Sequence, residues 1–213
     1  MQTLAEKVVP THTALLVVDL QNDYCDPDGA MARNGTDVSS TPPMLPVLAG
    51  LLDAARQAGV RVIFIRTTHD DWTDSAARKR LPRLQHMPIV RTGAWGAEYH
   101  GLAPQAGDYE ITKHRYSGFL GTPLDLVLRA QGVRTLIVTG VSTHTCVDCT
   151  VRDGFQHDYF VVVPGDCTAT YSPAVQAATL ANIRRHYGEV TPAAALEQIW
   201  AAGGYLAQGG AGN

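Results

Sequence analysis

The fold of this chain can be inferred from the stretch Thr135-Leu-Ile-Val-Thr-Gly-Val-Ser-Thr-His-Thr-Cys146-Val-Asp-Cys-Thr-Val-Arg-Asp-Gly154. Its first part is apolar and contains β-branched residues, which predicts a buried strand that ends at Thr139. Gly140 breaks the run, and a small polar turn then leads to Cys146 and to a helix that continues to Phe155. Backbone N–H groups point outward where such a helix begins, and they favour a thiolate and can hold an oxyanion. We therefore interpret Cys146 as a candidate nucleophile.

Strands alternate with helices on both sides of this stretch. This alternation indicates an α/β fold in which helices cover both faces of a parallel sheet. No repeat and no linker divides the chain, so we predict one domain over 1–213, with a core at about 13–200 and a flexible tail at 203–213. A loop is expected at 21–37, and a loop-rich lid or pocket wall at 66–108. Strands are predicted at 13–18, 60–65, 109–113, 136–139 and 159–163, and helices at 46–58, 122–131, 147–155, 172–186 and after 191.

The composition excludes several classes of partner. The 213 residues carry a formal net charge of −3, and their lysines and arginines are scattered, so we expect no nucleic acid and no anionic membrane as partner. No signal peptide and no apolar run of ~20 residues is visible, so we expect a cytoplasmic protein. The 4 cysteines are too few for a disulfide framework and lack the spacing of a zinc site, so reduced thiols are expected.

Three chemically active residues stand where predicted strands end: Asp19, Lys113 and Cys146. Ligands of an open parallel sheet bind outside the carboxyl ends of its strands, so all three can face one crevice. The ammonium would lower the pKa of the thiol, and the carboxylate could take the thiol proton and return it to a leaving nitrogen. Each residue also has a plain interpretation: Asp19 as a cap, Lys113 as a solvated charge and Cys146 as a small apolar side chain.

The sequence motifs around these residues resemble those of a known family. Asp19-Leu-Gln-Asn-Asp, Lys113-x-Arg-Tyr-Ser-Gly-Phe and Gly140-Val-x-Thr-x-x-Cys146-Val are similar to the signatures of the isochorismatase-like cysteine hydrolases. The resemblance implies a three-layer α/β/α fold with a doubly wound, six-stranded parallel sheet, and a triad of Asp19, Lys113 and Cys146. It also implies a non-proline cis peptide between Val141 and Ser142, which aims the Ser142 N–H, together with that of Cys146, at the substrate carbonyl oxygen. Members of the family are commonly dimers or tetramers.

Within the family, the segments 113–125 and 152–155 are most similar to ureidoacrylate amidohydrolases and N-carbamoyl amidases. That resemblance implies hydrolysis of a small amide or ureido C–N bond through a thioester, with no cofactor. Two positions depart from it: His144 stands where many relatives have Asn, and the segment 66–72 lacks the Asn-x-Trp pattern of ureidoacrylate enzymes. Nicotinamidases of the superfamily carry an Asp-x-His metal site at this point, but residue 67 is Thr, so we expect no metal.

Four further residues are candidates for the substrate pocket. Tyr24 and Tyr116 are pocket hydroxyls or packed aromatics, and His69 is a pocket donor or a surface-loop histidine. Arg115 could meet a substrate carboxylate or form a structural ion pair. Three rival functions stay open: a metal-dependent nicotinamidase, a non-catalytic binding protein with an unreactive Cys146, and a thiol–disulfide switch through Cys149.

Overall fold

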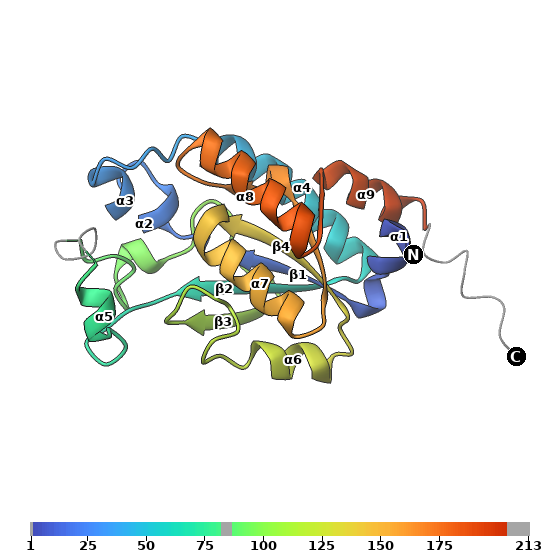
Figure 1. Cartoon of the computed structure of the whole chain (residues 1–213), viewed down its shortest axis with the longest axis horizontal. Coiled ribbons are helices and arrows are strands. Elements are labelled where there is room, and N and C mark those ends of the chain that lie inside the picture. The colour runs from blue at the N-terminus through green and yellow to red at the C-terminus, as the bar shows by residue number, and fades with distance from the viewer. Residues whose placement is uncertain (1, 82–86, 204–213) are drawn as a thin grey trace, which may run out of the picture.

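The computed structural model describes residues 2–81 and 87–203, which are organised around one parallel sheet (Figure 1). Six strands follow the order β3-β2-β1-β4-β5-β7, and the two-residue strand β6 pairs with the end of β4. The predicted α/β fold with a six-stranded parallel sheet is thereby confirmed, and β6 adds a short seventh strand. The strands are β1 (Thr13–Val18), β2 (Arg61–Thr67), β3 (Tyr109–Lys113), β4 (Thr135–Val141), β5 (Phe160–Pro164), β6 (Thr168–Ala169) and β7 (Glu189–Thr191).

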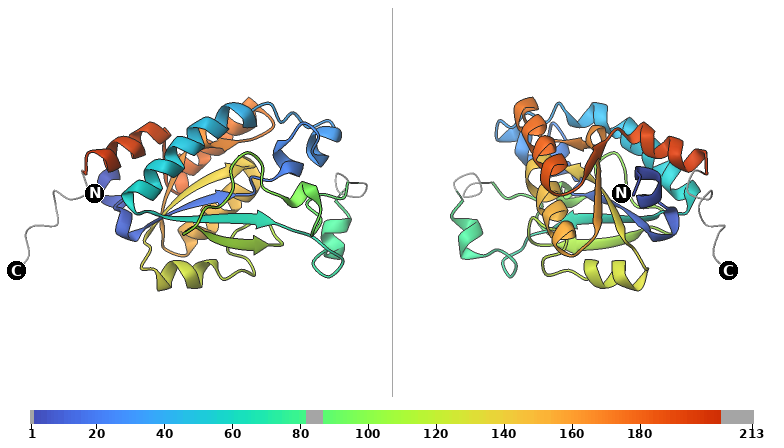
Figure 2. Two further views of the ribbon diagram at one scale, coloured as in Figure 1. Left: turned by 180° about the vertical axis from the view of Figure 1, so that it is seen from behind. Right: turned by 45° about the vertical axis from the view of Figure 1, so that its right-hand side comes forward.

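Helices cover both faces of the sheet, as the two views of Figure 2 show. Side chains of a strand alternate between faces, so Leu15 and Val17 of β1 pack on one side and Leu16 and Val18 on the other. Helices α4 and α9 supply the first core, and α6, α7 and α8 supply the second. The helices are α1 (Leu4–Lys7), α2 (Asn22–Cys25), α3 (Ala30–Arg33), α4 (Thr41–Ala58), α5 (Ala76–Lys79), α6 (Leu124–Ala130), α7 (Asp148–Gln156), α8 (Pro173–His186) and α9 (Ala193–Ala201), with short turns η1 (Pro10–His12), η3 (Trp95–Ala97), η4 (Thr143–Val147) and η5 (Gly165–Cys167).

Several element boundaries differ from those predicted. Helix α4 begins at Thr41 rather than at 46, because the first-turn N–H groups of a helix have no internal acceptor and prolines are tolerated there. Strand β2 continues to Thr67, two residues beyond its predicted end, and the predicted loop at 21–37 contains the one-turn helices α2 and α3. The π-helical turn η4 precedes α7, and β7 was not predicted from the residue pattern. Except for Gly203, the predicted tail lies outside the described residues.

No helix in the described part of the chain has both the length and the apolar character that crossing a bilayer requires.

Candidate active site

The three predicted catalytic residues meet at the carboxyl end of the sheet. Asp19 directly follows β1, Lys113 is the last residue of β3, and Cys146 lies in η4, just after β4. Strands β3, β2, β1 and β4 are neighbours in the sheet, so their ends lie side by side. Asp19 and Cys146 line the same cavity, whose volume is about 290 Å³. The structure therefore brings together what the sequence placed at separate strand ends.

Lys113 and Asp19 form a buried ion pair. The ammonium Nζ lies 2.7 Å from Asp19 Oδ2, and the two side chains are 0% and 1% exposed, respectively. Nζ also donates to Thr67 Oγ1 at 2.7 Å and to the Arg115 carbonyl at 3.0 Å, which uses all three ammonium protons. Burial would lower the pKa of Lys113, but the Asp19 carboxylate and Cys146 outweigh it and raise this pKa. The lysine is therefore a permanent cation at this end of the sheet.

Thr67 completes this pair and was not singled out from the sequence. It is the last residue of β2, between β1 and β3, and its hydroxyl donates to Asp19 Oδ1 at 2.8 Å while it accepts from Lys113. The amide of Gln21 holds the backbone of Thr67, since Nε2 donates to the Thr67 carbonyl and Oε1 accepts from its N–H, both at 2.8 Å. The sequence did contain a clue to Thr67. In parallel strands that lie side by side, its hydroxyl falls between the strand ends that carry Asp19 and Lys113.

The thiol of Cys146 is buried, and its pKa is raised. Burial is the largest cause, and the Asp19 carboxylate adds to it, whereas the Lys113 ammonium acts in the opposite direction and is outweighed. The prediction that this corner favours a thiolate is therefore wrong for the free site, because burial and the carboxylate were not visible in the residue pattern. A neutral thiol beside a carboxylate needs its proton removed as the reaction begins.

The turn between β4 and Cys146 has the backbone that the family resemblance implied. The peptide bond between Val141 and Ser142 is cis. Gly140 has a φ of 103°, and a Cβ built on it would lie 2.1 Å from the carbonyl oxygen of Val18. Only glycine fits where β4 comes this close to the end of β1.

All four candidate pocket residues line the cavity. Burial, followed by the charges at Asp19 and Cys146, raises the pKa of Tyr24 far above its usual value, so its hydroxyl stays protonated. His69 is 4% exposed, and the surface-loop interpretation is therefore wrong. Tyr116 is 43% exposed and lies at the rim. Arg115 also lines the cavity, where its Nη1 donates to the carbonyls of Thr73 and His114.

Other wall residues could not be assigned from the sequence. Tyr171 follows β6 and reaches the cavity because Ala169 pairs with Val141, a long-range contact that no local pattern reveals. The His144 ring packs edge-on against Tyr171 at 6.1 Å, and its Nδ1 lies 2.5 Å from Thr170 Oγ1. From the segment 66–108, six described residues contribute to the wall: Thr67, His69, Ala77, Arg78, Leu81 and Ile89.

No group of three or more His, Cys, Asp or Glu side chains within residues 2–81 and 87–203 is placed to hold an ion. All four cysteines have free thiols, and Cys149 does not line the cavity.

Comparisons with known proteins agree with this geometry. A model of the isochorismatase domain matches residues 13–195. The chain is 40% identical over 204 residues to ureidoacrylate amidohydrolase RutB of Methylobacterium radiotolerans, with 88% of this chain and 79% of that protein covered. It is similar to the crystal structure of a cysteine hydrolase from Pseudomonas syringae pv. phaseolicola 1448A, with a TM-score of 0.81, 33% identity and coverage of 91% and 94%. N-carbamoylsarcosine amidase from Thermoplasma acidophilum matches with a TM-score of 0.69, 26% identity and coverage of 85% and 96%.

Proposed function

The chain belongs to the isochorismatase family and is a hydrolase of carbon–nitrogen bonds other than peptide bonds, and we propose that it cleaves a small amide or ureido group by covalent catalysis through Cys146. The observation that carries this proposal is a thiol and a carboxylate that line one cavity, with the carboxylate paired to a buried ammonium. The Lys113–Asp19 contact of 2.7 Å and the raised pKa of Cys146 together define a neutral thiol next to a fixed base.

The first half of the proposed reaction forms a thioester. The Asp19 carboxylate takes the thiol proton as sulfur attacks the substrate carbonyl carbon, and the carbonyl oxygen becomes an oxyanion. The backbone N–H groups of Ser142 and Cys146 are proposed to donate to this oxyanion. When the tetrahedral adduct collapses, the C–N bond breaks, and the leaving nitrogen takes the proton from Asp19.

The second half returns the enzyme to its starting state. Asp19 removes a proton from water, the resulting hydroxide attacks the thioester, and the C–S bond breaks. The sulfur recovers a proton, and the acid product leaves. Lys113 holds Asp19 in place through both halves by its hydrogen bond to Asp19 Oδ2.

We propose a ureido acid as the substrate, with ureidoacrylate as the first candidate. The similarity to proteins named ureidoacrylate amidohydrolase supports this choice, and a cavity of about 290 Å³ is suited to a molecule of that size. Arg115 is proposed to bind the carboxylate of such an acid, because it lines the cavity and its Nη1 contacts backbone carbonyls rather than a described acidic side chain. A cytoplasmic location and assembly as a dimer or tetramer remain predictions from the sequence.

Ammonia release from ureidoacrylate, N-carbamoyl amino acids, nicotinamide and small amides tests this proposal. Cys146→Ser should reduce release from the preferred substrate by at least about 1,000-fold, because the nucleophile is lost while the fold is kept. The matched control is Cys149→Ala, one helical turn away, which should leave turnover within about twofold. Turnover by the Cys146 variant at the wild-type rate would exclude the proposed nucleophile. A large loss in the Cys149 variant would instead favour the thiol–disulfide function.

A further inference from the structure

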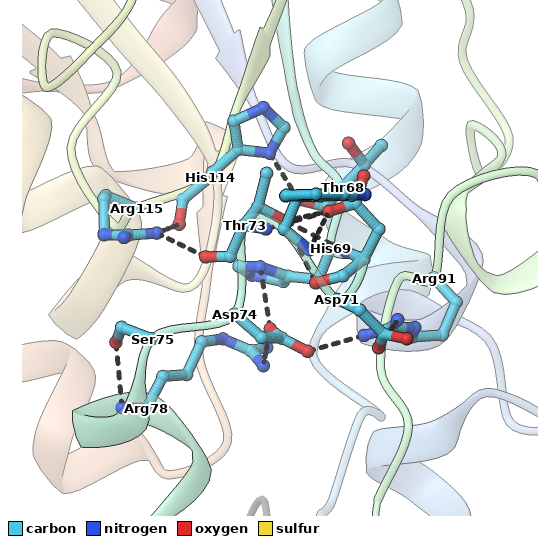
Figure 3. Close-up of polar contacts among 12 residues, drawn as sticks. Thr68, His69, Asp71, Thr73, Asp74, Ser75, Arg78, Arg91, His114 and Arg115 are labelled. Atoms are coloured by element: carbon cyan, nitrogen blue, oxygen red, sulfur yellow. Dashed lines mark hydrogen bonds and ion pairs between the residues drawn. The ribbon is translucent and has the colours of Figure 1, made fainter.

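One wall of the cavity is held by a network around the buried carboxylate of Asp74 (Figure 3). Its Oδ1 accepts from Arg78 Nη1 at 3.0 Å, its Oδ2 accepts from Arg91 Nη1 at 2.6 Å, and the side chain is only 8% exposed. The same carboxylate faces the imidazole of His69, with Oδ1 and Nδ1 3.4 Å apart. Two guanidinium groups therefore balance one carboxylate next to a histidine that lines the site.

Backbone hydrogen bonds hold the segment that carries His69 in place. Its backbone N–H donates to the Val90 carbonyl at 3.0 Å, and its carbonyl accepts from the Thr92 N–H at 3.0 Å, so the chain is held on both sides. Nδ1 is enclosed and faces Asp74 at ion-pair distance but without hydrogen-bond geometry. No hydrogen-bond partner of Nε2 is found among the described residues, and His69 lines the cavity.

The charges around His69 keep it neutral. Burial is the largest cause and Arg78 the next, and together with His114 and Lys113 they overcome the opposing effect of Asp74 and lower the pKa of His69 to about 4. A neutral imidazole carries one proton, and a carboxylate oxygen only accepts hydrogen bonds. The proton is therefore on Nδ1, facing Asp74, because a nitrogen lone pair there would be repelled by the negative charge. Nε2 is left as an acceptor.

We propose that His69 is a specificity-determining residue whose Nε2 accepts a hydrogen bond from an N–H of the substrate, and that Asp74 is the positioning residue that keeps the ring proton on Nδ1. This inference rests on the proposed function and deepens it. An amide or ureido group offers N–H donors, whereas an ester of similar shape offers none at its leaving group. The wall therefore selects amides and ureido compounds over esters.

The inference is tested by comparing kcat/KM for ureidoacrylate with that for nitrophenyl acetate, an ester that reacts with the same thiol. In His69→Leu the ureido-to-ester ratio should fall about 10- to 100-fold, because a substrate N–H is left without its acceptor. In His69→Gln, whose carbonyl can accept, most of the ratio should return. If His69→Leu lowered kcat/KM equally for both substrates, so that the ratio stayed unchanged, the inference would be overturned.

The positioning role of Asp74 is tested by measuring whether the effect of its substitution depends on His69. Asp74→Asn should lower the ratio several-fold, because an amide can face Nδ1 with its oxygen or with its N–H and no longer fixes the proton. The same change in the His69→Leu background should lower the ratio no further. The matched control is Asp71→Asn, since Asp71 also contacts Arg91 but is exposed and does not touch His69. Equal losses in both backgrounds would show that Asp74 does not act through His69.

A measurement on the wild-type protein covers the case in which the Asp74 variant fails to fold. ¹⁵N NMR of the His69 imidazole at neutral pH should show a protonated Nδ1 and an unprotonated Nε2. A proton on Nε2 would overturn the inference. Failure of the proposed function would look different: Cys146→Ser would then retain ureido hydrolysis, whatever the His69 variants do.

Discussion

Two buried aspartates border the cavity, and they differ in how their charge is balanced. Asp19, at the end of a central strand, is paired with one ammonium and one hydroxyl. Asp74, in the irregular segment after β2, is paired with two guanidinium groups. Asp19 lies next to a thiol that holds a proton, whereas Asp74 lies next to an imidazole that stays neutral.

The difference separates reaction chemistry from substrate selection. A carboxylate with a single cation keeps acceptor capacity and can take a proton, and the rigid strand ends hold it in place. The Asp74 carboxylate accepts hydrogen bonds from two guanidinium groups, and its proposed role is to orient its neighbour. The sheet therefore carries the proposed chemistry, and the loop carries the proposed choice of substrate.

The largest expected difference between the two aspartates concerns stability. Lys113→Met leaves the Asp19 carboxylate buried without the cation that pairs with it, which should lower the free energy of unfolding by about 3–5 kcal/mol and reduce turnover at least about 100-fold. Arg91→Met leaves Asp74 paired with Arg78 and should cost only about 1 kcal/mol. Urea denaturation of both variants measures the two losses in the free energy of unfolding. Equal losses would show that the two carboxylates do not differ in the way described.

A smaller effect is expected where a hydroxyl, rather than a charge, is removed. Thr67→Val deletes the bond to Asp19 Oδ1 and one acceptor of Lys113, and should lower the free energy of unfolding by about 1–3 kcal/mol and turnover several-fold. Thr67→Ser keeps the hydroxyl and serves as the control. If the Val and Ser variants were alike in turnover, the hydroxyl would have no part in holding the pair.

An effect of similar size is expected in the pH dependence of stability. The folded protein holds the pKa of His69 at about 4, below its usual value of 6.5, so below pH 6.5 the unfolded chain binds a proton that the folded one does not. Stability should therefore fall as pH drops from 6.5 towards 4, by about 1–3 kcal/mol from this residue. His69→Gln should flatten that part of the curve of unfolding free energy against pH. An unaltered slope would contradict the neutral imidazole.

The two regions also differed in how far the sequence predicted them. The strand-end residues stand beside apolar runs and within short motifs, so local patterns located Asp19, Lys113 and Cys146. The network around Asp74 depends on the chain returning to place Arg91 beside His69, a pairing that no local pattern encodes. The same limit explains why Tyr171 was missed. Burial of the thiol, which decides its pKa, is likewise a property of the whole packed site.

The covalent intermediate on Cys146 is the most direct test of the account. Wild-type protein should be mixed with the preferred ureido or amide substrate, quenched in acid within milliseconds to seconds, digested and analysed by mass spectrometry. The account predicts an acyl or carbamoyl adduct on the peptide that contains Cys146. The adduct should disappear once all the substrate has been turned over. Rapid turnover without any adduct at Cys146, together with undiminished activity of Cys146→Ser, would contradict it.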